Sequence, residues 1–171
     1  MKNLITLLFI SFSITLMSCG GKKETTAKVP GMMELDLTSH GLPITITIPD
    51  SSKGKVEVVD QSWGATEIKV GKEFQVSISE GEGDISLAKS DVKNNDVNKF
   101  QKYIVEEPTA ILYESKITEQ PEHHFYAVVK AGAKSFVIED IKGEMFSEQL
   151  AKNMLESAKA IKEKAPAAPK S

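Results

Sequence analysis

Residues 44 to 78 read ITITIPDSSKGKVEVVDQSWGATEIKVGKEFQVSI and contain the pattern that decides the fold. Apolar and polar residues alternate in four short segments, which is typical of strands that bury one face. The alternating apolar residues are Ile44, Ile46, Ile48, Val56, Val58, Ile68, Val70, Phe74, Val76 and Ile78. Turns are marked by Gly54, Gly64, Gly71, Gly81 and Gly83. Because parallel neighbours need longer crossovers than these connections allow, we predict an antiparallel meander.

The next segment, 84–105, changes to helical spacing. Its apolar residues are Ile85, Ala88, Val92, Phe100 and Ile104. Apolar residues three or four positions apart lie on one side of a helix. We therefore predict one helix here, with Asn94 and Asn95 as the point where it could break.

The C-terminal half returns to strands and ends in a helix. Strand character over 109–117, 125–130 and 135–141 predicts a second antiparallel meander. Ser147 can cap a helix with an apolar stripe of Leu150, Met154, Leu155, Ala158 and Ile161. We predict an α+β fold over 34–164, an antiparallel β-sheet with a middle helix and a C-terminal amphipathic helix packed on it. Residues 165–171 are rich in alanine and proline, so we expect a disordered tail.

This order of elements resembles the PsbP-like α/β sandwich, in which a strand hairpin runs into a closing helix. The likeness covers residues 43–162. The matching residues of the closing helix are Phe146, Ser147, Leu150, Met154, Leu155, Ser157 and Ile161. The resemblance implies a central antiparallel sheet with helices on its faces, in a family of accessory subunits, and a shared fold does not by itself assign a function.

The N-terminus has the layout of a secretory signal. Lys2 gives a positive start, and an apolar run from Leu4 to Met17 leads to the small residue Ser18. As a helix this run would rise about 21 Å, short of the ~30 Å hydrocarbon core of a membrane. We therefore expect a cleaved signal peptide over residues 1–18 and no permanent membrane span.

Residues 16–19, Leu-Met-Ser-Cys, resemble the lipobox of bacterial lipoproteins. That resemblance implies a diacylglyceryl group and a further acyl chain such as palmitate on Cys19. At about 0.8 kcal/mol for each buried CH₂, these chains would hold the protein on a membrane. Gly20 replaces the aspartate that signals inner-membrane retention in some bacteria, so we expect a lipid anchor in the cell envelope at the outer membrane. The domain could face either side of this membrane.

The segment after the cysteine is polar and has no apolar period. We therefore predict that residues 19–33, which begin with the lipidated Cys19 and contain Pro30, form a flexible tether. Such a segment has an end-to-end distance of about 20 Å. The domain would therefore stand just off the lipid headgroups.

Composition excludes several classes of protein. The formal net charge of -3 argues against nucleic acid as a partner. All 21 basic residues are lysine, so the chain has no guanidinium group for bidentate binding of phosphate. One cysteine cannot form an internal disulfide, and a chain of 171 residues buries enough surface to fold without one.

Glu122, His123 and His124 form the most reactive-looking cluster. Adjacent histidines on an extended segment point to opposite faces, so the pair alone is a poor chelator. His40 is the only other histidine. The favoured interpretation is a solvated hairpin turn, and the alternative is a weak metal site at His123 and His124.

No motif of a catalytic site is present. The sequence has no glycine-flanked serine of a nucleophile elbow and no phosphate-binding loop. The carboxylate pairs are Glu80 with Glu82, Glu106 with Glu107, and Glu139 with Asp140. These pairs are better explained as strand ends, turns or solvated edges than as acid/base catalysts. We therefore expect no catalytic residue, no cofactor and no enzyme.

Trp63 lies in a predicted turn, where a large apolar ring is unusual. It would either fill the core or stand exposed as an anchor at a protein interface. Our leading hypothesis is a lipid-anchored envelope module that binds a protein partner without catalysis. The alternatives are a carrier with a small-ligand or metal pocket between sheet and helix, and a hydrolase whose site is assembled from distant residues.

Overall fold

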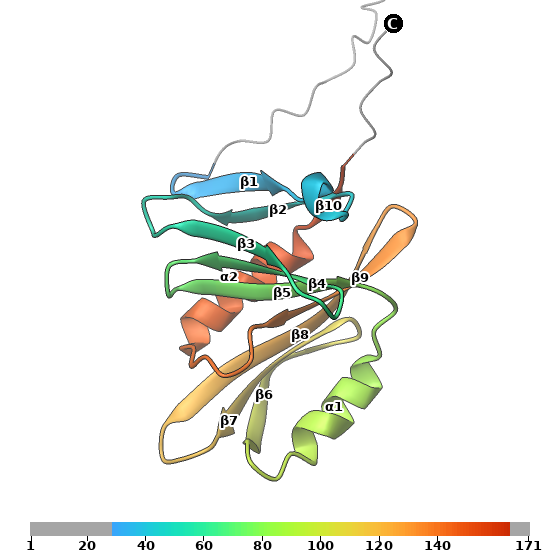
Figure 1. The fold of residues 1–171 in the computed structure, drawn as a ribbon. Coiled ribbons are helices and arrows are strands. Elements are labelled where there is room, and N and C mark those ends of the chain that lie inside the picture. The colour runs from blue at the N-terminus through green and yellow to red at the C-terminus, as the bar shows by residue number, and fades with distance from the viewer. Residues whose placement is uncertain (1–28, 165–171) are drawn as a thin grey trace, which may run out of the picture.

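The computed structural model describes residues 29–164, so the predicted signal peptide, Cys19, most of the predicted tether and the predicted disordered tail lie outside the described residues. The predicted α+β class with antiparallel strands is confirmed (Figure 1). The strands are β1 (Met32–Asp36), β2 (Ile44–Pro49), β3 (Val56–Asp60), β4 (Ala65–Val70), β5 (Phe74–Glu80), β6 (Lys99–Glu107), β7 (Ala110–Lys116), β8 (Pro121–Ala131), β9 (Lys134–Asp140) and β10 (Lys162–Glu163). The helices are η1 (Thr38–His40), α1 (Ile85–Lys93) and α2 (Glu148–Lys159).

The large sheet has seven strands in the order β3-β4-β5-β9-β8-β7-β6. It consists of two antiparallel meanders, β3 to β5 and β6 to β9. They join where β5 pairs with β9, with Ile78 opposite Ile138. Both of these residues are fully buried, so the joint between the meanders lies in the core.

The alternating segment at Ile44 forms a strand, but it does not belong to the predicted meander. β2 is the central strand of a separate three-stranded sheet, between β1 and β10. Its three isoleucines are fully buried and pack with residues of the large sheet and α2. Met32 and Met33 also differ from the prediction, because they belong to β1 and not to the tether.

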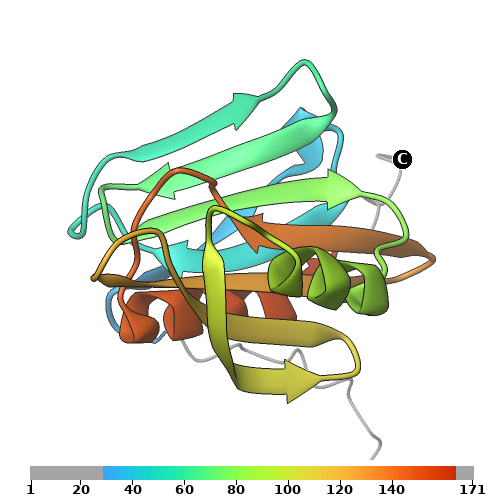
Figure 2. The ribbon, with the colours of Figure 1, turned by 90° about the horizontal axis from the view of Figure 1, so that it is seen from below.

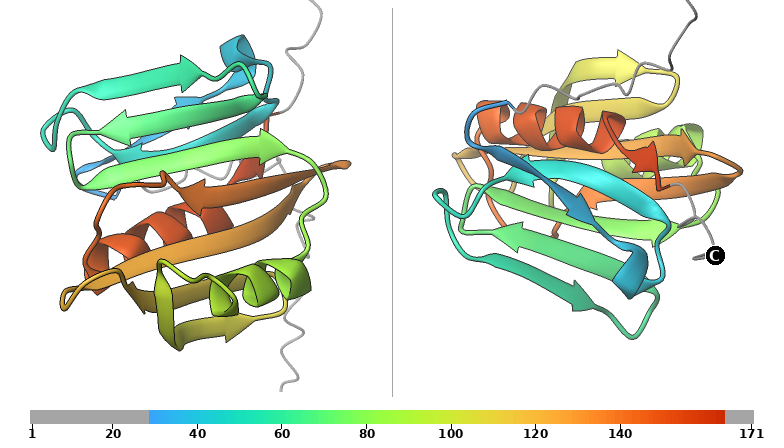
Figure 3. Two further views of the ribbon diagram at one scale, coloured as in Figure 1. Left: turned by 60° about the horizontal axis from the view of Figure 1, so that its bottom comes forward. Right: turned by 90° about the horizontal axis from the view of Figure 1, so that it is seen from above.

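Helix α2 covers the same face of the large sheet as the small sheet does (Figure 3). The Ser147 side chain accepts a hydrogen bond from the Leu150 backbone N–H at 3.4 Å, which caps the helix. Its buried residues are Ala151, Met154, Leu155, Ser157 and Ala158. They contact β8 most extensively, and also β2, β5, β7 and β9.

The predicted middle helix is shorter than its spacing suggested. Helix α1 ends at Lys93, and Phe100 and Ile104 lie in strand β6. Register shifts between Phe100 and Lys102 and between Tyr103 and Val105 bend this strand sharply (Figure 2). A bulge adds a residue and breaks the period of two, so apolar residues of a bulged strand can mimic helical spacing.

Helix α1 lies on the opposite face of the large sheet from α2 (Figure 3). None of its residues is buried, although Asp84 caps it by accepting hydrogen bonds from the backbone N–H groups of Ser86 and Leu87. The first and last strands, β1 and β10, lie together in the small sheet at the top of Figure 1, whereas α1 lies at the bottom.

Candidate functional site

A pocket of about 300 Å³ lies between α1 and the outer face of the large sheet. This volume is at the small end of the range for ligand sites in proteins. One wall comes from α1 and the turn that follows it, and the other comes from β7, β8, β9 and the turn after β9. The lining residues are Ala88, Asp91, Val92, Asn95, Asn98, Tyr113, His124, Phe125, Tyr126, Glu139, Asp140, Lys142 and Gly143.

A buried ion pair forms part of this lining. His124 Nδ1 lies 2.7 Å from Asp140 Oδ2, and the other carboxylate oxygen accepts a hydrogen bond from the Phe125 backbone N–H at 2.7 Å. His124 is only 7% exposed and Asp140 only 4%. The carboxylate therefore fixes both the ring and the backbone of β8, as expected for a rigid binding wall.

The other ring nitrogen of His124 has no hydrogen-bond partner within residues 29–164. It lies 3.5 Å from Glu122 Oε2, at the outer limit of hydrogen-bonding distance. Burial lowers the pKa of His124, but the hydrogen bond and charge of Asp140, with the charge of Glu122, outweigh it. The pKa of His124 therefore lies above its ordinary value of 6.5, which favours the imidazolium.

Three further groups of the pocket, Glu139, Tyr113 and Tyr126, have raised pKa values, and burial is the largest cause of each shift. Burial raises the pKa of Glu139, Lys142 lowers it, and the charge of Asp140 raises it again, with a net increase. Burial and the charges of Asp140 and Glu139 raise the pKa of Tyr113. Burial and the charge of Glu139 raise that of Tyr126. Burial, and to a lesser extent the neighbouring carboxylates, thus favour the protonated form of Glu139, Tyr113 and Tyr126.

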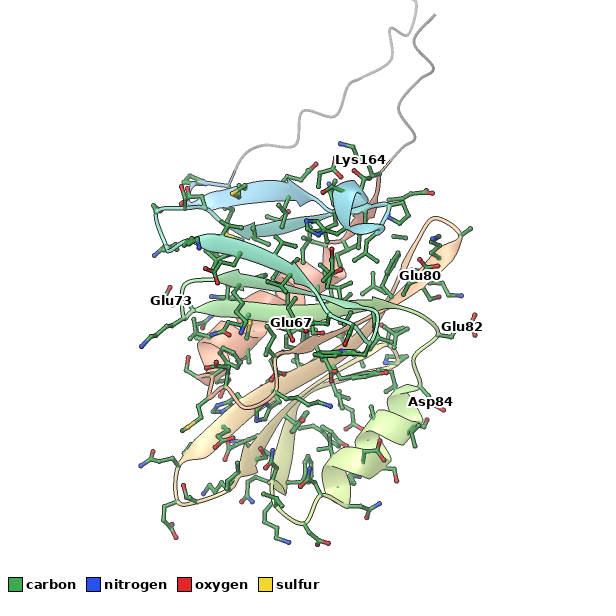
Figure 4. The ribbon with its side chains drawn as sticks, in the orientation of Figure 1. Glu67, Glu73, Glu80, Glu82, Asp84 and Lys164 are labelled. Carbon is green, nitrogen blue, oxygen red and sulfur yellow. The ribbon has the colours of Figure 1, made fainter. Side chains whose placement is uncertain are left out.

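Acidic residues continue beyond the pocket on the same face of the sheet. Glu67 on β4 lies opposite Ser77 on β5, which in turn lies opposite Glu139 on β9. Figure 4 shows Glu67 together with Glu82 and Asp84, which lead from the end of β5 into α1. Glu67 therefore adds an acidic residue to the outer face of the sheet, whereas Glu82 and Asp84 line a separate hollow at the start of α1.

His123 and His124 are buried in β8, so the favoured prediction of a solvated turn is wrong. Their neighbours confirm that the rings point to opposite faces, because His123 Nδ1 lies 3.2 Å from the Phe146 carbonyl oxygen, on the side of α2. Between residues 29 and 164, no group of three or more His, Cys, Asp or Glu is arranged to hold a metal ion. The pocket thus contains His124 but not His123.

Trp63 is 70% exposed in the turn between β3 and β4, so it does not fill the core. It follows β3, an edge strand of the large sheet, on which Val59 is also exposed. The remaining predicted site residue, Cys19, lies outside the described residues.

The sequence pattern missed most of the pocket. Glu139 and Asp140 do stand at the end of a strand, but β9 is an interior strand and both side chains line the pocket. Tyr113 and Tyr126 gave no signal, because tyrosines in strands are common. A signal was present in Glu122, His123 and His124, since three adjacent polar residues run directly into a buried strand and buried polar groups need partners.

None of the helices described within residues 29–164 is long and apolar enough to cross a membrane. No protein-family model, curated protein or solved structure gives a significant match to the chain. The function therefore has to be inferred from the chemistry of the pocket and the surface.

Proposed function

We propose that this protein is a lipid-anchored envelope module that binds a small ligand in the pocket between α1 and the large sheet. The observation that carries the proposal is the fixed His124–Asp140 pair in the wall of a preformed pocket. Ligand sites combine a concave surface with a few convergent polar groups, and perturbed pKa values mark such places.

The lining supports binding without catalysis. A histidine held by an aspartate activates a serine, threonine or cysteine in many hydrolases. No such residue lines the pocket within the described part of the chain. Ser115 is the nearest serine along β7 on this face, two residues after Tyr113, but it is fully buried and its hydroxyl has no hydrogen-bond partner among residues 29–164. In this proposal the His124–Asp140 pair orients the ligand and holds charge in the pocket wall.

The proposal can be tested with a variant in which a larger side chain on α1 fills the pocket. A screen of small metabolites by thermal shift should yield compounds that stabilise the wild-type protein, because a ligand that binds only the folded state raises its stability. Ala88→Phe, which fills the lining, should abolish these shifts. Leu87→Phe is the matched control, since Leu87 is 59% exposed on the same helix and does not line the pocket. Shifts that survive Ala88→Phe would contradict the proposal.

The lipid anchor on Cys19 is part of the proposal and rests on the lipobox. Cys19→Ala should release the protein from the membrane fraction, whereas Ser18→Ala should not. Digestion of intact cells with a protease that does not cross the outer membrane then shows on which side of that membrane the domain lies. Cleavage would place the domain on the surface, and protection would place it in the periplasm.

A second candidate function is the binding of a protein partner, which the exposure of Trp63 favours. An edge strand presents unpaired backbone groups that a partner strand can use, and a neighbouring tryptophan is a common interface anchor. A photo-crosslinking amino acid at position 63 should then trap one envelope protein in living cells. The same group at Ile117, which is also exposed, serves as the control. Equal crosslinking from both positions would remove this candidate.

A further inference from the structure

We propose that the pocket selects a small primary amine, bound as the ammonium ion. This inference rests on the proposed ligand-binding function and names the ligand class. Three carboxylates line the pocket, from Asp91, Glu139 and Asp140. Only His124 and Lys142 contribute positive charge to the lining, and His124 already lies between Asp140 and Glu122. The lining therefore contains more acidic than basic side chains, beside a space of ligand size.

Lys142 shows where an ammonium group fits. Its Nζ lies 3.8 Å from Glu139 Oε2, at the far limit of an ion pair, and its side chain is 86% exposed. An exposed pair of this length is weak. A ligand amine can therefore take the place of Nζ at Glu139 while Lys142 turns into solvent.

The aromatic part of the lining suits the same ligand. Tyr113 and Tyr126 stand on the sheet side of the pocket, and the Tyr113 ring lies 5.6 Å from that of His124. Phenol oxygens accept hydrogen bonds from N–H donors, and tyrosine faces attract cations. The Asn98 amide on the opposite side adds a further acceptor, whereas Asn95 Oδ1 already accepts hydrogen bonds from the backbone N–H groups of Val97 and Asn98.

Other ligand classes fit less well. An anion would lie against Glu139 and Asp140, with no arginine anywhere in the chain to hold it. A neutral ligand would leave the excess of acidic side chains in the lining without a counter-charge. A metal ion lacks a suitable group of three ligands within residues 29–164.

The experiment compares three probes with the same carbon chain, namely putrescine, 1,4-butanediol and succinate, by calorimetry on the purified protein. Putrescine should bind, and the neutral and anionic probes should bind about tenfold more weakly or not at all. Glu139→Gln should weaken putrescine about tenfold, whereas Glu139→Asp should retain most of the affinity. Glu57→Gln, which removes an acid of β3 outside the pocket, should leave it unchanged.

Lys142→Ala provides a second variant, which changes an exposed side chain. Because it removes the competing ammonium, it should tighten putrescine binding by about threefold. Equal binding of the three probes, preference for succinate, no binding of putrescine, or an unchanged affinity in Glu139→Gln would each overturn the amine class. If the neutral or anionic probe binds and is lost in Ala88→Phe, only the ligand class is wrong. If neither these probes nor the metabolite screen gives binding, the proposed function fails too.

Discussion

His124 Nδ1 and Asp140 Oδ2 lie 2.7 Å apart, at the place where the ladder between β8 and β9 ends. The last backbone pair of that ladder is Tyr126 with Glu139. Beyond it, the Asp140 carboxylate replaces the missing strand partner by accepting from the Phe125 N–H. One side chain thus completes the sheet and holds the charged ring in the pocket wall.

The pH dependence of stability should report the proton on His124. Its pKa is raised in the folded state, so between the unfolded value of 6.5 and the higher folded value the native protein holds a proton that the unfolded chain has lost. The stabilisation is complete below the unfolded pKa and disappears as the pH rises through the folded pKa. The free energy of unfolding in urea should therefore fall as the pH rises above the unfolded value of 6.5, and less steeply in His124→Gln. Identical slopes would show that another group titrates.

Removal of the Asp140 carboxylate should be strongly destabilising. Asp140→Ala leaves a buried imidazolium without its main partner and a backbone N–H without an acceptor, so we expect a loss of about 3 kcal/mol in the free energy of unfolding. The surface pair of His40 and Asp60, at 3.0 Å, is the matched control, because Asp60 is exposed. Asp60→Ala should have a much smaller effect in the same urea titration.

The turn between β4 and β5 should not accept a side chain at Gly71. This residue has φ +57°, and a Cβ there would lie 2.8 Å from the Lys53 carbonyl oxygen. Gly41 is the matched control, because it has φ +77° but a Cβ there would meet no atom within 4 Å. Both alanine variants bear the cost of a left-handed backbone, so the extra loss in Gly71→Ala, about 1 kcal/mol or more, measures the close approach. Equal thermal stability of the two variants would contradict this packing.

Helix α1 should open more readily than the rest of the domain. It has nine residues and none of them is buried, whereas α2 has five buried residues. Short helices depend on tertiary packing, so the amides of α1 should exchange with deuterium about tenfold faster than those of α2, or more. Asp84→Ala, which removes the cap, should speed exchange in α1 and leave α2 unchanged. Equal protection of the two helices would show that α1 is a fixed wall of the pocket.

Local patterns predicted much of the fold, including the meanders of β3 to β5 and β7 to β9, but not the separate sheet that contains β2. The alternation at Ile44, Ile46 and Ile48 correctly predicts a strand with one buried face. It cannot show which sheet contains that strand, because β1 begins inside the predicted tether and β10 is distant and only two residues long. The bulges of β6 erase the period of two, so Phe100 and Ile104 seemed helical. Such errors are expected wherever long-range contacts decide the structure.

The pocket was harder to predict, for a similar reason. His124 and Asp140 are 16 positions apart, and they meet only because β8 and β9 form a hairpin. The pocket also needs α1, and no regular sequence pattern indicates that this helix packs on the sheet. Local motifs could therefore mark His124 as unusual, but they could not show that Glu139 and Asp140 are its neighbours.

The position of β10 beside β2 has a consequence for biosynthesis. A chain is synthesised from its N-terminus, so β2 emerges from the ribosome long before α2 and β10 exist. The buried face of β2 shares its core with Met154 and Leu155 of α2. A nascent or truncated chain without these residues would expose Ile46 and Ile48 to water, which makes it a target for chaperones and proteases. The domain can therefore complete its core only after its last helix, α2, has been synthesised.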